Sequence, residues 1–217
     1  MRRPILVALL VLASGAPGVA AAAGWSFQAA VGFPFDLSLP LTIRQQGEAP
    51  IRVRARWETR PFESPLYYAL RGARWSGGSE WAVDLLHHKL YLTNPPPEVQ
   101  RFGVSHGYNL VLFSHAREVA RDTWARAGAG LVVAHPESTV RGRTFEGGGP
   151  LGGGYHLSGP AVVVGAERRF FPAGAVFLSV QGLAAASWAR VPVAGGHATV
   201  PDVSVHLLGG VGAASGR

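Results

Sequence analysis

Apolar and polar residues alternate with a period of two along most of the chain. In IRVRARWE, residues 51–58, the odd positions are apolar, whereas the even positions carry three arginines and a glutamate. The stretches TWARAGAGLVV at 123–133 and VFLSVQGLAAASW at 176–188 repeat this alternation. Successive side chains of a strand point to opposite faces, and helix-period patterns are nearly absent. The sequence therefore predicts an all-β fold.

Ten segments carry this pattern and are predicted as strands. They span residues 25–33, 37–46, 51–59, 66–75, 80–91, 101–114, 122–134, 159–171, 175–190 and 202–212. The second segment is the weakest because Pro40 cannot donate to a strand ladder. The region around 116–124 is also weak because it has helical spacing. If the segments 25–33 and 37–46 merge and another link is misread, eight strands are the alternative count. Since no repeat, charge block or Ser/Gly linker divides residues 24–217, we expect a single domain there.

The N-terminus has the features of a cleaved secretory signal over residues 1–23. Arg2 and Arg3 precede an apolar run from 5 to 13, and small residues at 20–23 suit a signal peptidase. This run is interrupted well before the ~20 residues that a transmembrane helix needs. An export signal, together with small apolar residues on one strand face and glycines on the other, favours an antiparallel up-and-down transmembrane β-barrel over a soluble sandwich.

The links between the predicted strands alternate in length. Outer-membrane barrels have short periplasmic turns and longer outer loops, with both termini in the periplasm. With ten strands, the links at 47–50, 76–79, 115–121 and 172–174 are periplasmic. The links at 60–65, 92–100, 135–158 and 191–201 are then outside, and they include the Gly-rich tract EGGGPLGGGYHLSG.

The balance of charge predicts anionic partners. The chain has 20 Lys and Arg against 13 Asp and Glu, for a net charge of +7, and removal of the two N-terminal arginines leaves +5. Nucleic acid is not expected as the partner of an exported chain, whereas outer-membrane lipid such as lipopolysaccharide suits the destination. The chain has no cysteine, and we expect no cofactor and no metal.

The combination of signal segment, two-residue alternation, turn spacing and aromatic residues near strand ends resembles small outer-membrane β-barrel proteins of Gram-negative bacteria. The aromatic residues concerned are Trp25, Trp57, Trp75, Trp81 and Trp188. This resemblance implies a monomer in the outer membrane that contacts its lipids. Such proteins usually end in an aromatic residue, whereas this chain ends LLGGVGAASGR.

Some barrels of this class modify lipid A, and certain deacylases among them carry a His-x-Ser pair with a downstream carboxylate. The matching residues here are His156, Ser158 and Glu167. In an unbroken strand Glu167 points to the opposite side from Ser158, because the two lie nine residues apart.

A candidate catalytic pair lies in the hairpin around TNPPPEVQ at 93–100. If the indices of opposed residues add up to 193, His88 faces Ser105 across the two strands. Nucleophilic catalysis also needs a third group to orient the histidine, for which Glu98 or Glu58 are within reach. On regular strands Ser105 cannot pair with His106, and His87 with His88 cannot bind one metal ion, but a bulge at Gly103 or Gly107 would change this.

The alternative interpretation makes these polar residues part of the filling of a narrow barrel. Buried arginines need carboxylate partners, and several of each are predicted to face the lumen. This predicted lumen charge network comprises Arg52, Arg54, Arg56, Glu58, Glu80, Asp84 and Arg126. His88 and Ser105 would then only hydrogen-bond within the lumen.

These expectations lead to three functional hypotheses. The first is an outer-membrane β-barrel with a charged, closed lumen and a structural or lipid- and surface-interacting role, too narrow for a general porin. The second is a lipid A acyl hydrolase or acyltransferase that uses His88 and Ser105. The third is a soluble periplasmic lipid-binding barrel, whose interior would be apolar.

Overall fold

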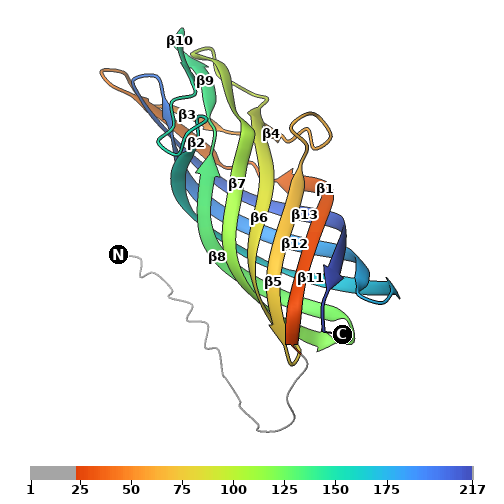
Figure 1. Ribbon diagram of the computed structural model, residues 1–217. Helices are drawn as coiled ribbons and strands as arrows, with labels where there is room; N and C mark the ends of the chain where they lie inside the picture. Colours follow the sequence, from red (N-terminus) through yellow and green to blue (C-terminus); the bar gives the residue numbers. More distant parts are fainter. Residues whose placement is uncertain (1–22, 217) are drawn as a thin grey trace, which may run out of the picture.

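The computed structural model describes residues 23–216, and all regular structure in this part of the chain is β (Figure 1). The predicted signal segment lies outside the described residues except for Ala23. The strands are β1 (Ala23–Asp36), β2 (Pro40–Gln45), β3 (Ile51–Arg54), β4 (Trp57–Glu58), β5 (Tyr68–Ser76), β6 (Ser79–Leu92), β7 (Val99–Ala120), β8 (Thr123–Ala134), β9 (Glu137–Val140), β10 (Arg143–Glu146), β11 (His156–Ala173), β12 (Val176–Val193) and β13 (Gly196–Ala214). Within these residues no helix has the length and apolar character to cross a membrane.

Eight of these strands form a closed antiparallel ring. In ring order they are β1, β5, β6, β7, β8, β11, β12 and β13, each paired with the next. β13 pairs back to β1, with Ser26 opposite Ala214 and Asp36 opposite Ser204, which closes the ring. The predicted antiparallel up-and-down β-barrel is confirmed.

The count of ten strands was wrong, and the eight-strand alternative is correct. The predicted segments 37–46 and 51–59 form β2, β3 and β4, which lie outside the ring because β1 pairs directly with β5. β2 and β3 make a hairpin that pairs with the end of β13, where Gln45 lies opposite Gly196. The strong alternation of 51–58 has another origin: Ile51 and Ala55 are buried under the loops, whereas the arginines between them face solvent.

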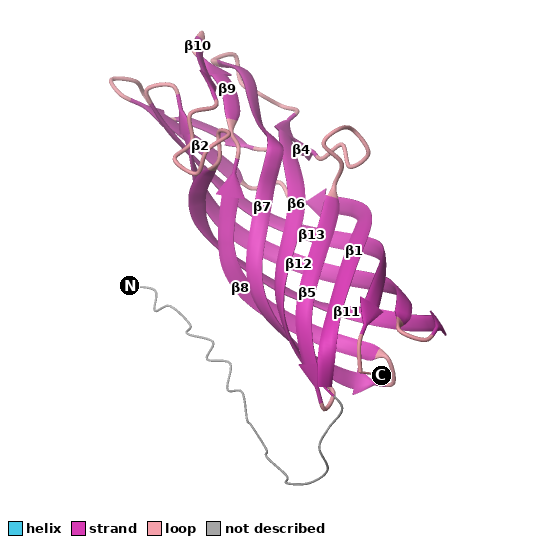
Figure 2. Ribbon diagram, in the orientation of Figure 1, coloured by secondary structure: helices cyan, strands magenta, loops and turns pink. Residues whose placement is uncertain are grey.

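Short turns and long loops lie at opposite ends of the ring (Figure 2). The end that we call the terminal end has the turns 77–78, 121–122 and 174–175, and Ala23 lies there opposite Ser76. The other end, the loop end, has the links 37–67, 93–98, 135–155 and 194–195. Three predicted links therefore change: the turn at 47–50 belongs to the loop end, and most of 115–121 and of 191–201 is strand.

The outer face of the ring is apolar on all eight strands. Exposed large apolar side chains include Phe27, Phe33 and Phe35 on β1, Leu70 on β5, Trp81 and Val83 on β6, Val111 and Phe113 on β7, Leu131 on β8, Val162 and Val164 on β11, Leu178 and Val180 on β12, and Val205, Leu207 and Val211 on β13. The opposite faces of the same strands bury polar and charged groups. This arrangement is the reverse of that in a soluble barrel.

The interior is layered along the barrel, and the inward residues of β6 give the order. Glu80 and Asp84, near the terminal end, belong to a buried ion cluster, and Leu86 belongs to an apolar layer above it. His88 lies in a second polar layer, and Leu90 joins an apolar core formed with the loops. Next to the ion cluster there is a cavity of about 20 Å³, room for about one water molecule. Side chains therefore fill this level of the ring.

Candidate functional site

His88 and Ser105 do not meet in the structure, because the predicted register between β6 and β7 was wrong. His88 lies opposite Tyr108, and further along the pair Leu90 lies opposite Val104. His88 and Leu90 are two residues apart on β6, whereas the residues opposite them on β7, Tyr108 and Val104, are four apart. The two extra residues of β7 form a bulge around Gly107, whose φ is 130°. The register is already shifted at His88, before the bulge, so Tyr108 lies where Ser105 was predicted.

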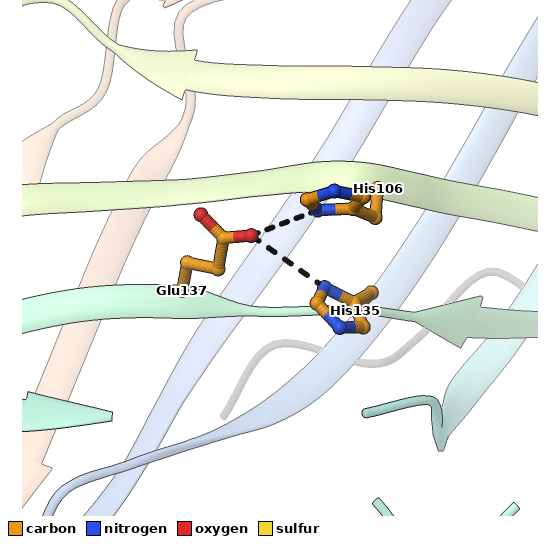
Figure 3. Close-up of side chains that lie close together, drawn as sticks. All are labelled: His106, His135 and Glu137. Atoms are coloured by element: carbon orange, nitrogen blue, oxygen red, sulfur yellow. Dashed lines mark hydrogen bonds and ion pairs between the residues drawn. The ribbon is translucent and has the colours of Figure 1, made fainter. Parts of the chain in front are cut away.

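The bulge brings three polar side chains together, His106, His135 and Glu137 (Figure 3), of which His106 is exposed and Glu137 is buried. His106 Nδ1 lies 2.8 Å from Glu137 Oε1, and His135 Nδ1 lies 3.8 Å from the same oxygen. Ser105 Oγ lies 3.1 Å from His106 Nδ1. Glu137 comes from β9, which pairs with β7 so that Glu137 faces Gly103. We call His106, His135 and Glu137 the rim cluster.

Glu137 is the buried anchor of the rim cluster. Its Oε2 accepts a hydrogen bond from Arg101, which leaves Oε1 directed at the two imidazoles. Burial alone would raise the pKa of Glu137. The hydrogen bond from Ser105, the charge of Arg101 and the contact with His106 outweigh burial and hold the pKa of Glu137 below its ordinary value. The carboxylate is therefore ionised at neutral pH.

His135 is held by the Gly-rich loop of residues 146–155. Its ring packs edge-on against Tyr155, with centroids 5.2 Å apart, and the Tyr155 hydroxyl donates to the His106 carbonyl at 2.9 Å. Gly154, with φ of 84°, lies so close to the ring that any side chain there would overlap His135. His135 Nδ1 is buried and makes no hydrogen bond within the described residues.

The contacts of Ser105, His106 and Glu137 differ from those of a serine hydrolase. In such an enzyme the serine and the carboxylate bind opposite nitrogens of the histidine. Here both lie beside Nδ1 of His106, so the carboxylate occupies the position that a base needs free for the serine proton. The geometry favours a group that binds a cation over one that activates a nucleophile.

His88 instead belongs to the buried second polar layer. Its Nε2 lies 2.8 Å from Asp36 Oδ1, and Asp202 is close enough for the three residues to offer ligand atoms within 4.8 Å of one another. Ser204 donates to Asp202 at 2.9 Å and lies 3.0 Å from His206 Nε2. This chain of contacts spans the interior where the ring meets the loops.

The other groups proposed to orient His88 lie elsewhere. Glu58 is exposed and pairs with Arg60 at 2.8 Å, and Glu98 is exposed in the link between β6 and β7. His87, on the opposite face of β6, lies 2.7 Å from Asn109 and stacks on Tyr68. No metal site joins His87 to His88 among the clusters found in the described residues.

The predicted lumen charge network divides into two groups. Glu80, Asp84 and Arg126 lie inside the ring, with Arg126 Nη1 2.9 Å from Asp84 Oδ1. Arg52, Arg54, Arg56 and Glu58 are exposed on the loops, so their placement in the lumen was wrong. The reason is the eight-stranded ring, which leaves residues 51–58 outside it.

The buried ion cluster has partners that the predicted network did not include. Arg169 donates to both carboxylate oxygens of Glu80, at 2.8 and 3.0 Å, and to Glu167 at 2.9 Å. Arg71 Nε lies 3.1 Å from Glu80 Oε1. Three arginines therefore balance three carboxylates. Glu167 and Arg169 share the inward face of β11, but the charged Arg168 between them faces outward, so the alternation of apolar and polar residues is broken there.

The deacylase-like residues do not form a site. Ser158 donates to the backbone carbonyl of His156 at 3.0 Å, and Glu167 is buried in the ion cluster. Sequence reasoning missed Asp36 and Asp202 of the buried layer and His135 and Glu137 of the rim cluster. The weakest signals were those of Asp36 and Glu137: each is a carboxylate at the end of a strand, and Glu137 shares the His-x-Glu spacing with His135.

No protein-family model matches the chain, and no curated protein matches it in sequence. Solved structures give likenesses of the fold. Neisserial surface protein A is 13% identical with a TM-score of 0.38, covering 90% of this chain and 99% of that one. The chain resembles small outer-membrane β-barrel proteins.

Two further structures show the same likeness. Ail, the attachment invasion locus protein of Yersinia pestis, is 9% identical with a TM-score of 0.38, covering 88% of this chain and 97% of that one. Outer membrane protein AlkL in lipid bilayers is 11% identical with a TM-score of 0.46, covering 96% and 98%. The closed strand ring itself establishes the fold.

Proposed function

We propose that the protein is an integral outer-membrane β-barrel with a charged, closed lumen, and that its folded loop end serves a surface- and lipid-interacting role. The observation that carries this proposal is the apolar outer face on all eight strands around a buried ion cluster. Soluble monomers rarely expose continuous apolar surface beyond a few hundred Å². A lipid-binding barrel in water would have the opposite arrangement, with an apolar interior.

The height of the apolar face suits a membrane. On β1 it runs from Trp25 to Phe35, which at ~3.3 Å per residue is about 33 Å along the strand. At a usual tilt of about 40° this corresponds to roughly 25 Å along the barrel axis, the height of the apolar band of outer-membrane barrels. Exposed Trp25 and Trp81 near the terminal end and Trp188 near the loop end suit the two membrane interfaces.

Fractionation tests the membrane assignment. We expect the full chain, expressed in a Gram-negative host, to stay in the membrane pellet after a urea wash and to need detergent for extraction. On gels the unheated protein should migrate faster than the heated protein, because a closed barrel resists the detergent. Release by osmotic shock without detergent would overturn the proposal.

Arginines at the loop end support a lipid-interacting role. Arg52, Arg54 and Arg56 are exposed side by side on one face of the chain and make no ion pair among the described residues. Positive side chains near an anionic membrane surface contribute about 1 kcal/mol each, or roughly fivefold in affinity. We propose lipopolysaccharide phosphates as their partner.

A charge-removal experiment tests this partner. Replacing the three arginines by glutamine should weaken binding of the detergent-solubilised protein to lipopolysaccharide roughly hundredfold at low salt. A matched control replaces Arg74, Arg117 and Arg121, which are exposed near the terminal end, and should bind like the native protein. Equal loss in both triple variants would show that net charge alone is responsible and would contradict the proposal.

A further inference from the structure

We propose that the rim cluster of His106, His135 and Glu137 is a binding site for a divalent transition-metal ion such as Zn²⁺. The two imidazole nitrogens and one carboxylate oxygen lie within 4.8 Å of one another. Two of the three separations are 2.8 and 3.8 Å. Ligand atoms around a tetrahedral zinc ion with bonds of ~2.0 Å are about 3.3 Å apart, so small side-chain movements suffice.

The donor types select the class of ion. Two imidazoles and one carboxylate suit zinc and its neighbours in the first transition row, whereas calcium and magnesium prefer sites made of oxygen alone. Three protein ligands leave a fourth position for water or another small ligand. His106 is 57% exposed in its side chain, which gives an ion a direct path from solvent.

Neighbouring groups already orient the three ligands. Arg101 holds Glu137 Oε2, so that Oε1 is the oxygen left for a metal ion. Tyr155 hydrogen-bonds to the His106 carbonyl and packs against His135. Such support around the ligands commonly raises metal affinity 10–100-fold. The buried Nδ1 of His135, which makes no hydrogen bond within the described residues, is the atom that a metal ion would satisfy.

The charges near the site permit a cation. Arg101 is the positive group in contact with Glu137, but it also pairs with Glu146 at 3.2 Å. One arginine therefore stands beside two carboxylates, and both histidines bind metal as neutral rings. A divalent ion compensates the remaining negative charge.

A second trio, Asp36, His88 and Asp202, also offers ligand atoms within 4.8 Å. The rim cluster is the better candidate because His106 is open to solvent, whereas His88 and Asp36 of the trio are buried in the interior and give an ion no direct path. An Asp202→Asn variant separates the two sites.

Titration of the folded, chelator-treated protein in detergent micelles tests the proposal. We expect one Zn²⁺ per chain by calorimetry, and visible absorption bands of a four-coordinate ion when Co²⁺ is used instead. His106→Ala, His135→Ala and Glu137→Gln should each lower Zn²⁺ affinity at least tenfold. His197→Ala removes another partly exposed histidine at the loop end and should bind normally, as should Asp202→Asn. Heat-modifiable gel mobility verifies that each variant is folded.

Three outcomes would overturn the proposal. The first is no heat or absorption change up to about 1 mM Zn²⁺ or Co²⁺, a weak affinity for a protein site. The second is unchanged binding in a folded His106→Ala, His135→Ala double variant. The third is loss of binding in Asp202→Asn, which would assign the ion to the buried trio.

Discussion

Glu80 and Arg169 form a two-point contact between buried side chains, with hydrogen bonds of 2.8 and 3.0 Å. Removing one member of a buried ion pair leaves the other charge without compensation, which costs about 3–5 kcal/mol. Arg169→Met should therefore lower the free energy of unfolding by about that amount in urea titrations in micelles. Arg52→Met, at an exposed position, should change it by less than about 0.5 kcal/mol.

Glu137 gives the loop end a defined acid sensitivity. Because its pKa is lowered in the folded state, its contribution to stability is full above the ordinary glutamate pKa of about 4.3. The contribution is lost as the pH falls through the lower, folded-state pKa. The native protein should therefore be more stable than Glu137→Gln at pH 5, and the margin should shrink as the pH falls below about 4. Unfolding curves at pH 5, 4 and 3 measure it, and a margin that grows over this range would contradict the assignment.

The sequence predicted the face of some residues and missed the contacts of others. Asp84 and Arg126 were placed inside because parity along a strand fixes its faces. The alternation around Arg52 is equally clear, but Arg52 was predicted to face the lumen and is exposed on the loops. Alternation alone does not distinguish a strand of the ring from a strand of a hairpin outside it. Asp36 and Glu137 were missed because their contacts join strands far apart in the chain.

Among the elements, the bulge in β7 controls the rim cluster. Gly107 has φ of 130°, and a side chain there would overlap Asn109. Gly107→Ala should lower the free energy of unfolding by about 1–3 kcal/mol and weaken binding of Zn²⁺, if the rim cluster binds it. Gly209→Ala, on an outward position with open space, should be neutral or slightly stabilising. Denaturant titrations of both variants compare the two glycines.

The hairpin of β2 and β3 is separable from the ring. Since β1 pairs directly with β5 and with β13, replacing residues 40–54 by a short Gly/Ser link should leave a heat-modifiable barrel. The variant should lose stability because Leu41, Ile43 and Ile51 leave the loop-end core. A chain that no longer inserts would indicate that the hairpin is needed for ring closure.

Register was the element-level property that the sequence could not provide. In a regular hairpin the residue numbers of two opposed residues always add up to the same value. A register predicted from the turn residues, such as Pro95, assumes that neither strand has an extra residue. The two extra residues around Gly107 change the sum between Tyr108 and Val104. Glycine at that position was compatible with a bulge, but strand patterning does not show that one occurs.

For the molecule as a whole, the filled interior predicts the absence of ion flow. An ion cluster, an apolar layer, a second polar layer and the loop-end core follow one another along the barrel, and the space beside the ion cluster is only about 20 Å³. The purified protein in planar lipid bilayers should show no stable open-channel conductance at moderate voltages. A 16-stranded porin reconstituted in parallel serves as the positive control, and steady conductance steps from this protein would disprove the layered closure.

At this scale the sequence predicted the class of fold well. Two-residue alternation and the spacing of short and long links were sufficient for a barrel, because they reflect the two environments that each strand separates. The number of strands was not determined, since residues 37–59 form real strands that do not join the ring.

The loop-end core has a consequence for how the exposed surface can change. Side chains from separate loops and strand ends, including Leu41, Val99, Val140 and Val193, pack into one apolar cluster. Loops that share a core cannot diverge one at a time, because an insertion or a new side chain in one must be accommodated by the others. If the loop end lies at the cell surface as proposed, variants selected against antibodies or phages should carry paired substitutions across loops, or single changes confined to exposed tip positions such as Gln46.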